Sequence, residues 1–125
     1  MFKVIQTEKA PAAIGPYSQA LIHGNTLYSS GQIPINPADG QVVDGDIKVQ
    51  TEQVMKNIGA VLAEAGVTYT NVIKTTCFLK DMNDFAAFNE IYAQYFTGKP
   101  ARSCVQAAKL PKDVLCEVEV IAIIE

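Results

Sequence analysis

The C-terminal stretch "CEVEVIAII", residues 116–124, decides the fold because it predicts a strand with apolar side chains on both faces. Side chains alternate between the two faces of a strand. One face would carry Cys116, Val118, Val120, Ala122 and Ile124, and the other Glu117, Glu119, Ile121 and Ile123. The second face is acidic near the start of this strand and apolar at its far end. Because both faces would need cover, we expect an oligomer.

The segments before this strand predict the element order β, β, β, α, β, α, β, β, which is typical of an α+β domain. Strands are expected at 2–5, on either side of the turn Gly24-Asn25 within 17–31, at 68–80, up to Val105, and at 114–124. The turn-rich stretch 35–45 predicts a surface loop. We therefore expect one domain over residues 1–125.

Two segments have helical periodicity. The first carries Val54, Ile58, Val61, Leu62 and Ala65 at helix spacing and ends at the candidate cap Gly66. The second, over 81–98, carries the aromatic stripe Phe85, Phe88, Tyr92 and Tyr95, with Asn83 or Asp84 as its N-cap. Two helices can cover only one face of a mixed sheet of about six strands. The other face should then be polar or buried by a partner.

Composition restricts the function classes. The chain has 125 residues, 49% of them hydrophobic, and a net charge of −3. No basic stripe is present, so we expect no nucleic-acid partner. No segment has the length or composition of a membrane span or a targeting peptide. Three widely spaced cysteines favour neither a disulfide framework nor a zinc site, so a reducing cytoplasmic location is expected.

The stretch "PARSCVQ", residues 100–106, carries the main candidate for chemistry. Arg102 and Cys104 would share one strand face, and a hairpin between the last two strands would bring Glu117 and Glu119 near Arg102. One interpretation is a structural Arg–Glu ion pair. The other is an anion clamp, in which the planar guanidinium holds a substrate carboxylate and a glutamate acts as acid or base.

Other chemical groups favour simpler interpretations. His23, the only histidine, adjoins the hairpin turn and should be exposed. Arg102 would favour a Cys104 thiolate, but no histidine is placed to serve as its base. Cys77 and Cys116 are expected in the core. Asp81, Asn83 and Asp84 are expected to cap the second helix rather than to bind a metal.

Five motifs together resemble the RidA (YjgF/YER057c/UK114) family. They are "IGPYSQA" (14–20), "SSGQIPINP" (29–37), "DMNDFAAFNEIY" (81–92), "PARSCVQAAKLPKD" (100–113) and "CEVEVIAI" (116–123). They follow one another in register over nearly the whole chain. The arginine and glutamate of the active enamine/imine deaminase subgroup are both present, as Arg102 and Glu117.

The resemblance implies a chorismate-mutase-like (Bacillus-type) α+β fold. It also implies a homotrimer with a barrel-like core of sheets, helices outside and pockets between subunits. The implied activity is hydrolysis of reactive enamines and imines, namely 2-aminoacrylate, 2-iminopropanoate and 2-iminobutanoate, to 2-oxo acids and ammonia. No metal or cofactor is implied.

The resemblance also implies roles for particular residues. Arg102 would bind the substrate carboxylate and Glu117 would activate water. The main chain at Cys104 and Gly31 would contact the substrate, and the pocket lining would include Tyr17, Ser30 and Asn89. Two alternatives are a ribonuclease or translation-inhibitor protein that acts on RNA, and a trimer that binds ligands or acts like a chaperone without turnover.

Overall fold

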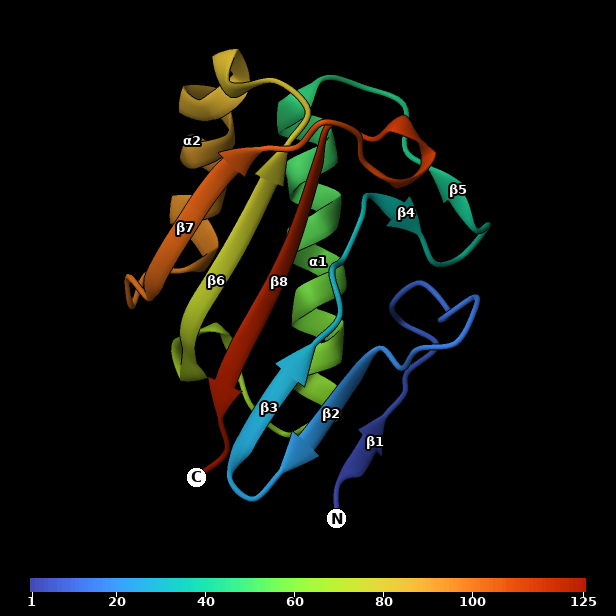
Figure 1. Ribbon diagram of the computed structural model, residues 1–125, viewed down its shortest axis with the longest axis vertical. Helices are drawn as coiled ribbons and strands as arrows, with labels where there is room; N and C mark the ends of the chain where they lie inside the picture. Colours follow the sequence, from blue (N-terminus) through green and yellow to red (C-terminus); the bar gives the residue numbers. More distant parts are fainter.

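A mixed sheet with both α-helices on one side forms the framework of the computed structural model, which describes residues 1–125 (Figure 1). The strand order is β1-β2-β3-β8-β6-β7, and only β6 and β7 run parallel. The strands are β1 (Lys3–Ile5), β2 (Ala20–His23), β3 (Thr26–Ser29), β6 (Val72–Leu79), β7 (Ala101–Gln106) and β8 (Cys116–Ile123). The helices are α1 (Ile47–Glu64) and α2 (Phe85–Tyr95). This confirms the predicted mixed α+β class and the placement of both helices on one face.

Helix α1 begins earlier than its apolar periodicity indicated. The side chain of Asp46 accepts a hydrogen bond from the backbone N–H of Val49, which supplies the N-cap. Gly66 follows the C-cap with a φ of 80°, a conformation that glycine adopts without strain. The buried stripe includes Val54, Ile58 and Leu62, as predicted. Helix α1 therefore covers the centre of the sheet, against β8.

Helix α2 packs its aromatic stripe between α1 and the sheet. Phe88 and Tyr92 are buried, and the Tyr92 hydroxyl is 2.7 Å from the Thr75 hydroxyl of β6. Asp84, one of the two predicted N-cap residues, occupies the N-cap position, but its side chain accepts no capping hydrogen bond. Asp81 instead caps the preceding 3₁₀ turn, where it accepts a hydrogen bond from the Asn83 N–H. Thr75 therefore marks the helix-covered face of the sheet.

Two local predictions need adjustment. The hairpin around Gly24-Asn25 is confirmed as β2 and β3. The expected loop at 35–45 contains a further small hairpin, β4 (Ile35–Asn36) with β5 (Gln41–Val42). The strand expected at 68–80 begins only at Val72, because a 3₁₀ turn, Tyr69–Asn71, precedes it.

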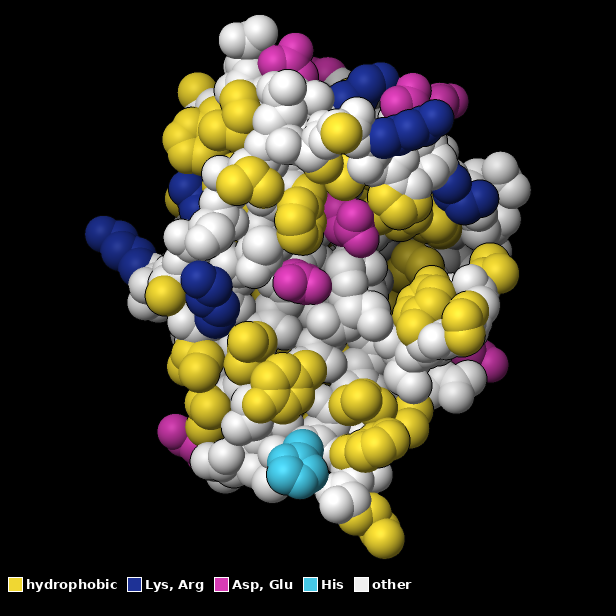
Figure 2. Space-filling view, in the orientation of Figure 1, with side chains coloured by type: hydrophobic (Ala, Val, Ile, Leu, Met, Phe, Trp, Pro, Cys, Tyr) yellow, Lys and Arg dark blue, Asp and Glu magenta, His cyan; other side chains and the backbone are white.

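The face of the sheet turned away from the helices is open within the chain. We call it the open face; by strand register it carries Val4, Leu21, Tyr28, Lys74, Thr76, Phe78, Val105, Glu117, Glu119 and Ile121. In the view shared by Figures 1 and 2 this face lies in front of α1, and acidic groups stand near its middle among apolar ones. Val4, Tyr28 and Val105 are 50%, 49% and 48% exposed. The second face of β8 is therefore partly apolar but has no cover from its own chain.

Candidate functional site

Arg102 lies on β7, at the edge of the sheet, and is held by α2. Its Nη1 donates a 2.7 Å hydrogen bond to Asn89 Oδ1. Its guanidinium carbon lies 4.7 Å from the ring centroid of Tyr92 and 5.3 Å from that of Phe85. These contacts fix the plane of the guanidinium by stacking and by one hydrogen bond. The guanidinium is half-buried, and no carboxylate of the protein pairs with its remaining N–H groups.

The first of the two interpretations of Arg102, a structural ion pair with a β8 glutamate, is not found in the structure. The only salt bridges join Lys48 to Glu90 and Lys80 to Asp113. Strand β6 lies between β7 and β8, so the last two strands do not form a hairpin. The structural Arg–Glu interpretation therefore fails within the chain.

Strand register places Arg102 and Glu117 on opposite faces. Arg102 is opposite Thr75, and Glu117 is opposite Phe78. Thr75 and Phe78 are three residues apart on β6, and side chains alternate between faces, so they point in opposite directions. Two strand spacings also separate β7 from β8, roughly 9–10 Å. One small molecule therefore cannot contact both side chains of the same chain.

The outer edge of β7 offers main-chain donors and acceptors. The N–H of Ala107 donates to the carbonyl of Leu79 on β6. Backbone groups alternate in direction along a parallel ladder, so those of Ser103 and Val105 also face β6. The N–H and C=O groups of Arg102 and Cys104 then point to the free edge. This edge can supply the main-chain contact predicted for Cys104, next to the guanidinium.

The Cys104 thiol is less acidic than the sequence suggested. It is half-buried on the covered face, beside Cys77 on the neighbouring strand. Burial raises the pKa of Cys104 more than the nearby Arg102 lowers it. The expected stabilisation of a Cys104 thiolate by Arg102 is therefore outweighed. Cys77 and Cys116 are fully buried, as predicted, and burial raises the pKa of each to about 12.

Glu117 belongs to a second group of residues, formed where β3 leaves β8. The regular register ends at Tyr28 opposite Ile121 and resumes only as a single bridge between Gln32 and Val118. Within this bulge, the Ser29 hydroxyl accepts a 2.9 Å hydrogen bond from the Val120 N–H. Ser30 and Gly31 are thereby turned out of the ladder, beside Glu117.

Gly31 is required by the position of the Glu117 side chain. A Cβ built at Gly31 would overlap the Glu117 carboxylate. The carboxylate therefore lies directly over the Gly31 backbone, in space that only glycine leaves free. Burial raises the pKa of Glu117, and the neighbouring charge of Glu119 raises it further. This glutamate is a stronger base than one in free solution.

A cavity of 490 Å³ opens beside Glu117. Its polar lining includes Tyr17, Ser30, Gly31, Lys112 and Glu117, and its apolar wall includes Pro11, Ala12, Ile14, Ile33 and Ile35. Four of the predicted site residues thus meet here: Tyr17, Ser30, Gly31 and Glu117. The other two with side-chain roles, Asn89 and Arg102, line a separate cavity of 510 Å³ between α2 and β7.

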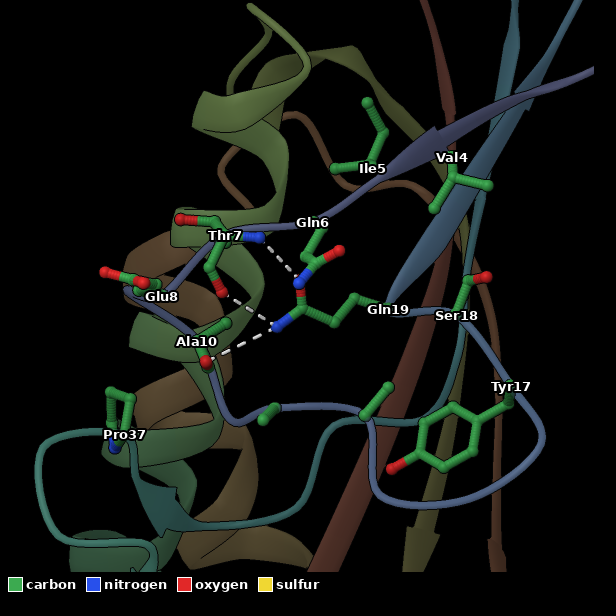
Figure 3. Close-up of a pocket in the computed structure, with 12 residues that line it drawn as sticks. Val4, Ile5, Gln6, Thr7, Glu8, Ala10, Tyr17, Ser18, Gln19 and Pro37 are labelled. Carbon is green, nitrogen blue, oxygen red and sulfur yellow. Dashed lines mark hydrogen bonds between the residues drawn. The ribbon is translucent and has the colours of Figure 1, made fainter.

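The buried Gln19 holds the loop that carries Tyr17, as Figure 3 shows. Its side-chain Nε2 donates to the carbonyls of Thr7, Ala10 and Pro11 at 3.0, 3.3 and 2.8 Å. Its Oε1 accepts a 2.7 Å hydrogen bond from the Thr7 N–H. The Ser30 hydroxyl donates to the Ser18 carbonyl at 2.6 Å. The sequence does not indicate this role of Gln19, because no local pattern predicts that an amide side chain is buried.

His23, the possible metal ligands and the helices bear on other kinds of site. His23 is exposed at the end of β2, as predicted. No group of three or more histidine, cysteine, aspartate or glutamate side chains is arranged to hold a metal ion. Neither helix combines the length and the apolarity that a bilayer crossing requires.

Comparison with known proteins identifies the family. The sequence model described as endoribonuclease L-PSP matches residues 7–124. A RutC family protein of Pyrococcus horikoshii is 58% identical over 123 residues, which cover 98% of each chain. The rat protein named 2-iminobutanoate/2-iminopropanoate deaminase is 52% identical over 122 residues, covering 97% of this chain and 89% of the rat chain.

Solved structures agree with this fold. A protein of the conserved Rid family, YyfA from Yersinia pestis, has a TM-score of 0.97 at 52% identity and covers 99% of this chain and 100% of its own. Escherichia coli TdcF with bound serine has a TM-score of 0.93 at 43% identity and covers 98% of this chain and 99% of its own. The chain therefore belongs to the RidA/YjgF family, which the endoribonuclease L-PSP model describes.

Proposed function

We propose that this chain is a hydrolytic deaminase of reactive 2-amino-enamines and 2-imino acids, among them 2-aminoacrylate, 2-iminopropanoate and 2-iminobutanoate. The observation that carries the proposal is the unpaired guanidinium of Arg102, which is half-buried, stacked on α2 and without a protein carboxylate. A substrate carboxylate would satisfy its free donors. The rat relative's name and the serine held by TdcF support a small amino-acid-like ligand.

We place the complete site between two subunits of a homotrimer. Arg102 and Glu117 face opposite sides of one sheet, so a ligand can meet both only if they come from different chains. The exposed apolar residues of the open face support such an assembly, since a partner would remove them from water. In this arrangement the sheets pack inward, as in a chorismate-mutase-like trimer, and the helices lie outside.

The proposed reaction needs little beyond binding and proton transfer. Arg102 and the outward N–H of Cys104 hold the carboxylate while C3 of the enamine takes a proton from solvent, which gives the iminium ion. Glu117 removes a proton from water as its oxygen adds to C2, which gives a tetrahedral aminoalcohol. The same carboxyl returns the proton to nitrogen, the C2–N bond breaks to release ammonia, and the C2 hydroxyl loses its proton to solvent as the 2-oxo acid forms. Because the imine carbon is already electrophilic, a modest acceleration suffices.

A coupled assay tests the proposed function. A serine dehydratase generates 2-aminoacrylate from serine, and the rate of 2-oxo acid release is followed with and without this protein. Faster release than the spontaneous rate supports the proposal, and an unchanged rate contradicts it. Boiled protein and the double variant Arg102→Ala/Glu117→Gln control for nonspecific effects.

Ribonuclease activity, which the family description names, has less support in this chain. The net charge of −3 gives no general attraction for phosphates. His23 lines neither cavity. We therefore make RNA cleavage a control measurement in the same preparations rather than a second proposal.

Cys104→Ser should retain most of the deaminase turnover, within about threefold of the wild type. Our reason is that the site uses the main chain of Cys104, while burial keeps its thiol protonated. Steady-state kinetics with 2-aminoacrylate check this, with circular dichroism as the folding control. Complete loss of turnover in a folded variant would indicate that the sulfur itself reacts.

A further inference from the structure

Lys112 occupies an unusual backbone position at the rim of the Glu117 cavity. It lies in the 3₁₀ turn Pro111–Asp113, between β7 and β8. Its φ is 54°, and that of Asp113 is 56°. Left-handed backbone is uncommon for residues other than glycine, and two in succession cost free energy that surrounding contacts must offset.

Contacts on both sides of Lys112 hold this turn in place. The Asp113 carboxylate pairs with Lys80 at 3.1 Å, and the Asp113 N–H donates to the Leu110 carbonyl at 3.0 Å. Leu110 and Val114 are buried and anchor the two ends. Lys112 itself contributes no hydrogen bond or ion pair to this framework. The fold therefore maintains an unfavourable backbone conformation around a side chain that does not stabilise it.

The charges around the cavity indicate a role for the Lys112 ammonium group. Glu117 and Glu119 lie on the open face with no cation paired to either. Their field repels an incoming anion, although the proposed substrates all carry a carboxylate. Lys112 is exposed and lines the same cavity as Glu117, so it is the cation that an anion meets at this rim. Opposite charge at a cavity mouth raises the local concentration of a charged ligand.

We propose that Lys112 captures the anionic substrate at the mouth of the Glu117 cavity and offsets the repulsion from Glu117 and Glu119. This inference rests on the proposed deaminase function. It assigns Lys112 no part in bond making or breaking. Its contribution to binding is equal for the substrate and the transition state, so it should act on KM and leave kcat unchanged.

The test compares charge removal at Lys112 with the same change elsewhere. Lys56, exposed on α1 and outside both site cavities, provides the matched control Lys56→Gln. At low salt, Lys112→Gln should lower kcat/KM by roughly three- to tenfold with kcat retained, while Lys56→Gln leaves both unchanged. The loss of kcat/KM in Lys112→Gln should be smaller at about 0.5 M salt, because salt then screens charges that lie more than a few ångströms apart. Lys112→Arg should restore most of kcat/KM.

A second variant separates capture from a structural role. Lys112→Gly should raise the midpoint of urea unfolding at fixed protein concentration, because glycine adopts positive φ without strain. Its kcat/KM should nevertheless fall by about as much as that of Lys112→Gln. A glycine variant with full kcat/KM, or a glutamine variant that matches Lys56→Gln, overturns the inference while the deaminase function stands. An inactive wild type overturns both.

Discussion

Arg102→Ala should lose almost all deaminase efficiency while the protein stays folded. Removing one partner of a buried charge-assisted contact costs roughly 2–5 kcal/mol, which corresponds to a roughly 30- to 5,000-fold loss of kcat/KM. The fold should survive because Arg102 makes one hydrogen bond, to Asn89, and no ion pair. Circular dichroism checks the fold, and coupled kinetics measure the loss.

Arg102→Lys should be impaired almost as severely. Lysine keeps the positive charge and could still lie over the Tyr92 ring, but it cannot offer two parallel N–H donors to a carboxylate. Calorimetry with pyruvate or 2-oxobutanoate separates binding from chemistry, because these product-like acids bind without reacting. If Arg102→Ala binds them normally, the guanidinium is instead a structural partner of Asn89 and the aromatic rings.

The sequence predicted those parts of the fold that depend on local pattern. Alternation along 116–123 identified β8, and the aromatic stripe identified α2, because each periodicity follows from the geometry of one element. The turn at Gly24-Asn25 was found for the same reason. Gly24 adopts a φ of 61°, which glycine permits.

Strand neighbours could not be predicted in the same way. The sequence favoured a hairpin of the last two strands because consecutive strands often pair. Helix α2 instead carries the chain across the sheet, so β7 returns parallel to β6 and outside it. The long strand β6 then occupies the place beside β8. This choice depends on packing of the whole sheet, and it decides which face Arg102 and Glu117 occupy.

The candidate site was only partly visible for a related reason. Family motifs supplied its residues, but no motif states that they divide into two groups on opposite faces of one sheet. Lys112 was missed because its left-handed backbone occurs at a lysine and an aspartate rather than at a glycine. Its significance comes from the cavity that it shares with Glu117, which only the folded chain reveals.

Glu117→Gln should lower kcat by roughly 10²–10⁴ if proton transfer is its main role. Glutamine keeps the shape over Gly31 but cannot accept the proton of water. Binding of pyruvate or 2-oxobutanoate should be kept or tightened, because a negative charge near the ligand is removed. A folded Glu117→Gln protein that binds neither acid would assign Glu117 to binding instead.

The pH dependence should follow from the raised pKa of Glu117. The base works only when ionised, so kcat should fall as pH drops through that raised pKa. Glu119→Gln removes a neighbouring charge that raises the pKa of Glu117, so the fall of kcat at acid pH should move to lower pH.

The raised pKa of Glu117 also makes the stability of the fold depend on pH. Glu117 binds its proton more tightly in the folded state than in the unfolded state, so the free energy of unfolding decreases as pH rises from the unfolded pKa to the folded pKa. Glu117→Gln should therefore be more stable than wild type above this window and equal to it below.

Mixing the two inactive variants should restore activity if Arg102 and Glu117 meet across a subunit boundary. A site pairs the Arg102 of one subunit with the Glu117 of its neighbour. A Glu117→Gln subunit beside an Arg102→Ala subunit therefore forms one site with both wild-type side chains. Random trimers from equal amounts would contain about a quarter of such sites, since each of the two positions is correct half of the time. Co-expression with two affinity tags isolates the mixed trimers, in each of which one site of the three is complete, and each variant alone gives the baseline. Activity near a third of wild type in the isolated mixed trimers supports the shared site, whereas activity no higher than the baseline contradicts the shared site and the proposed assembly.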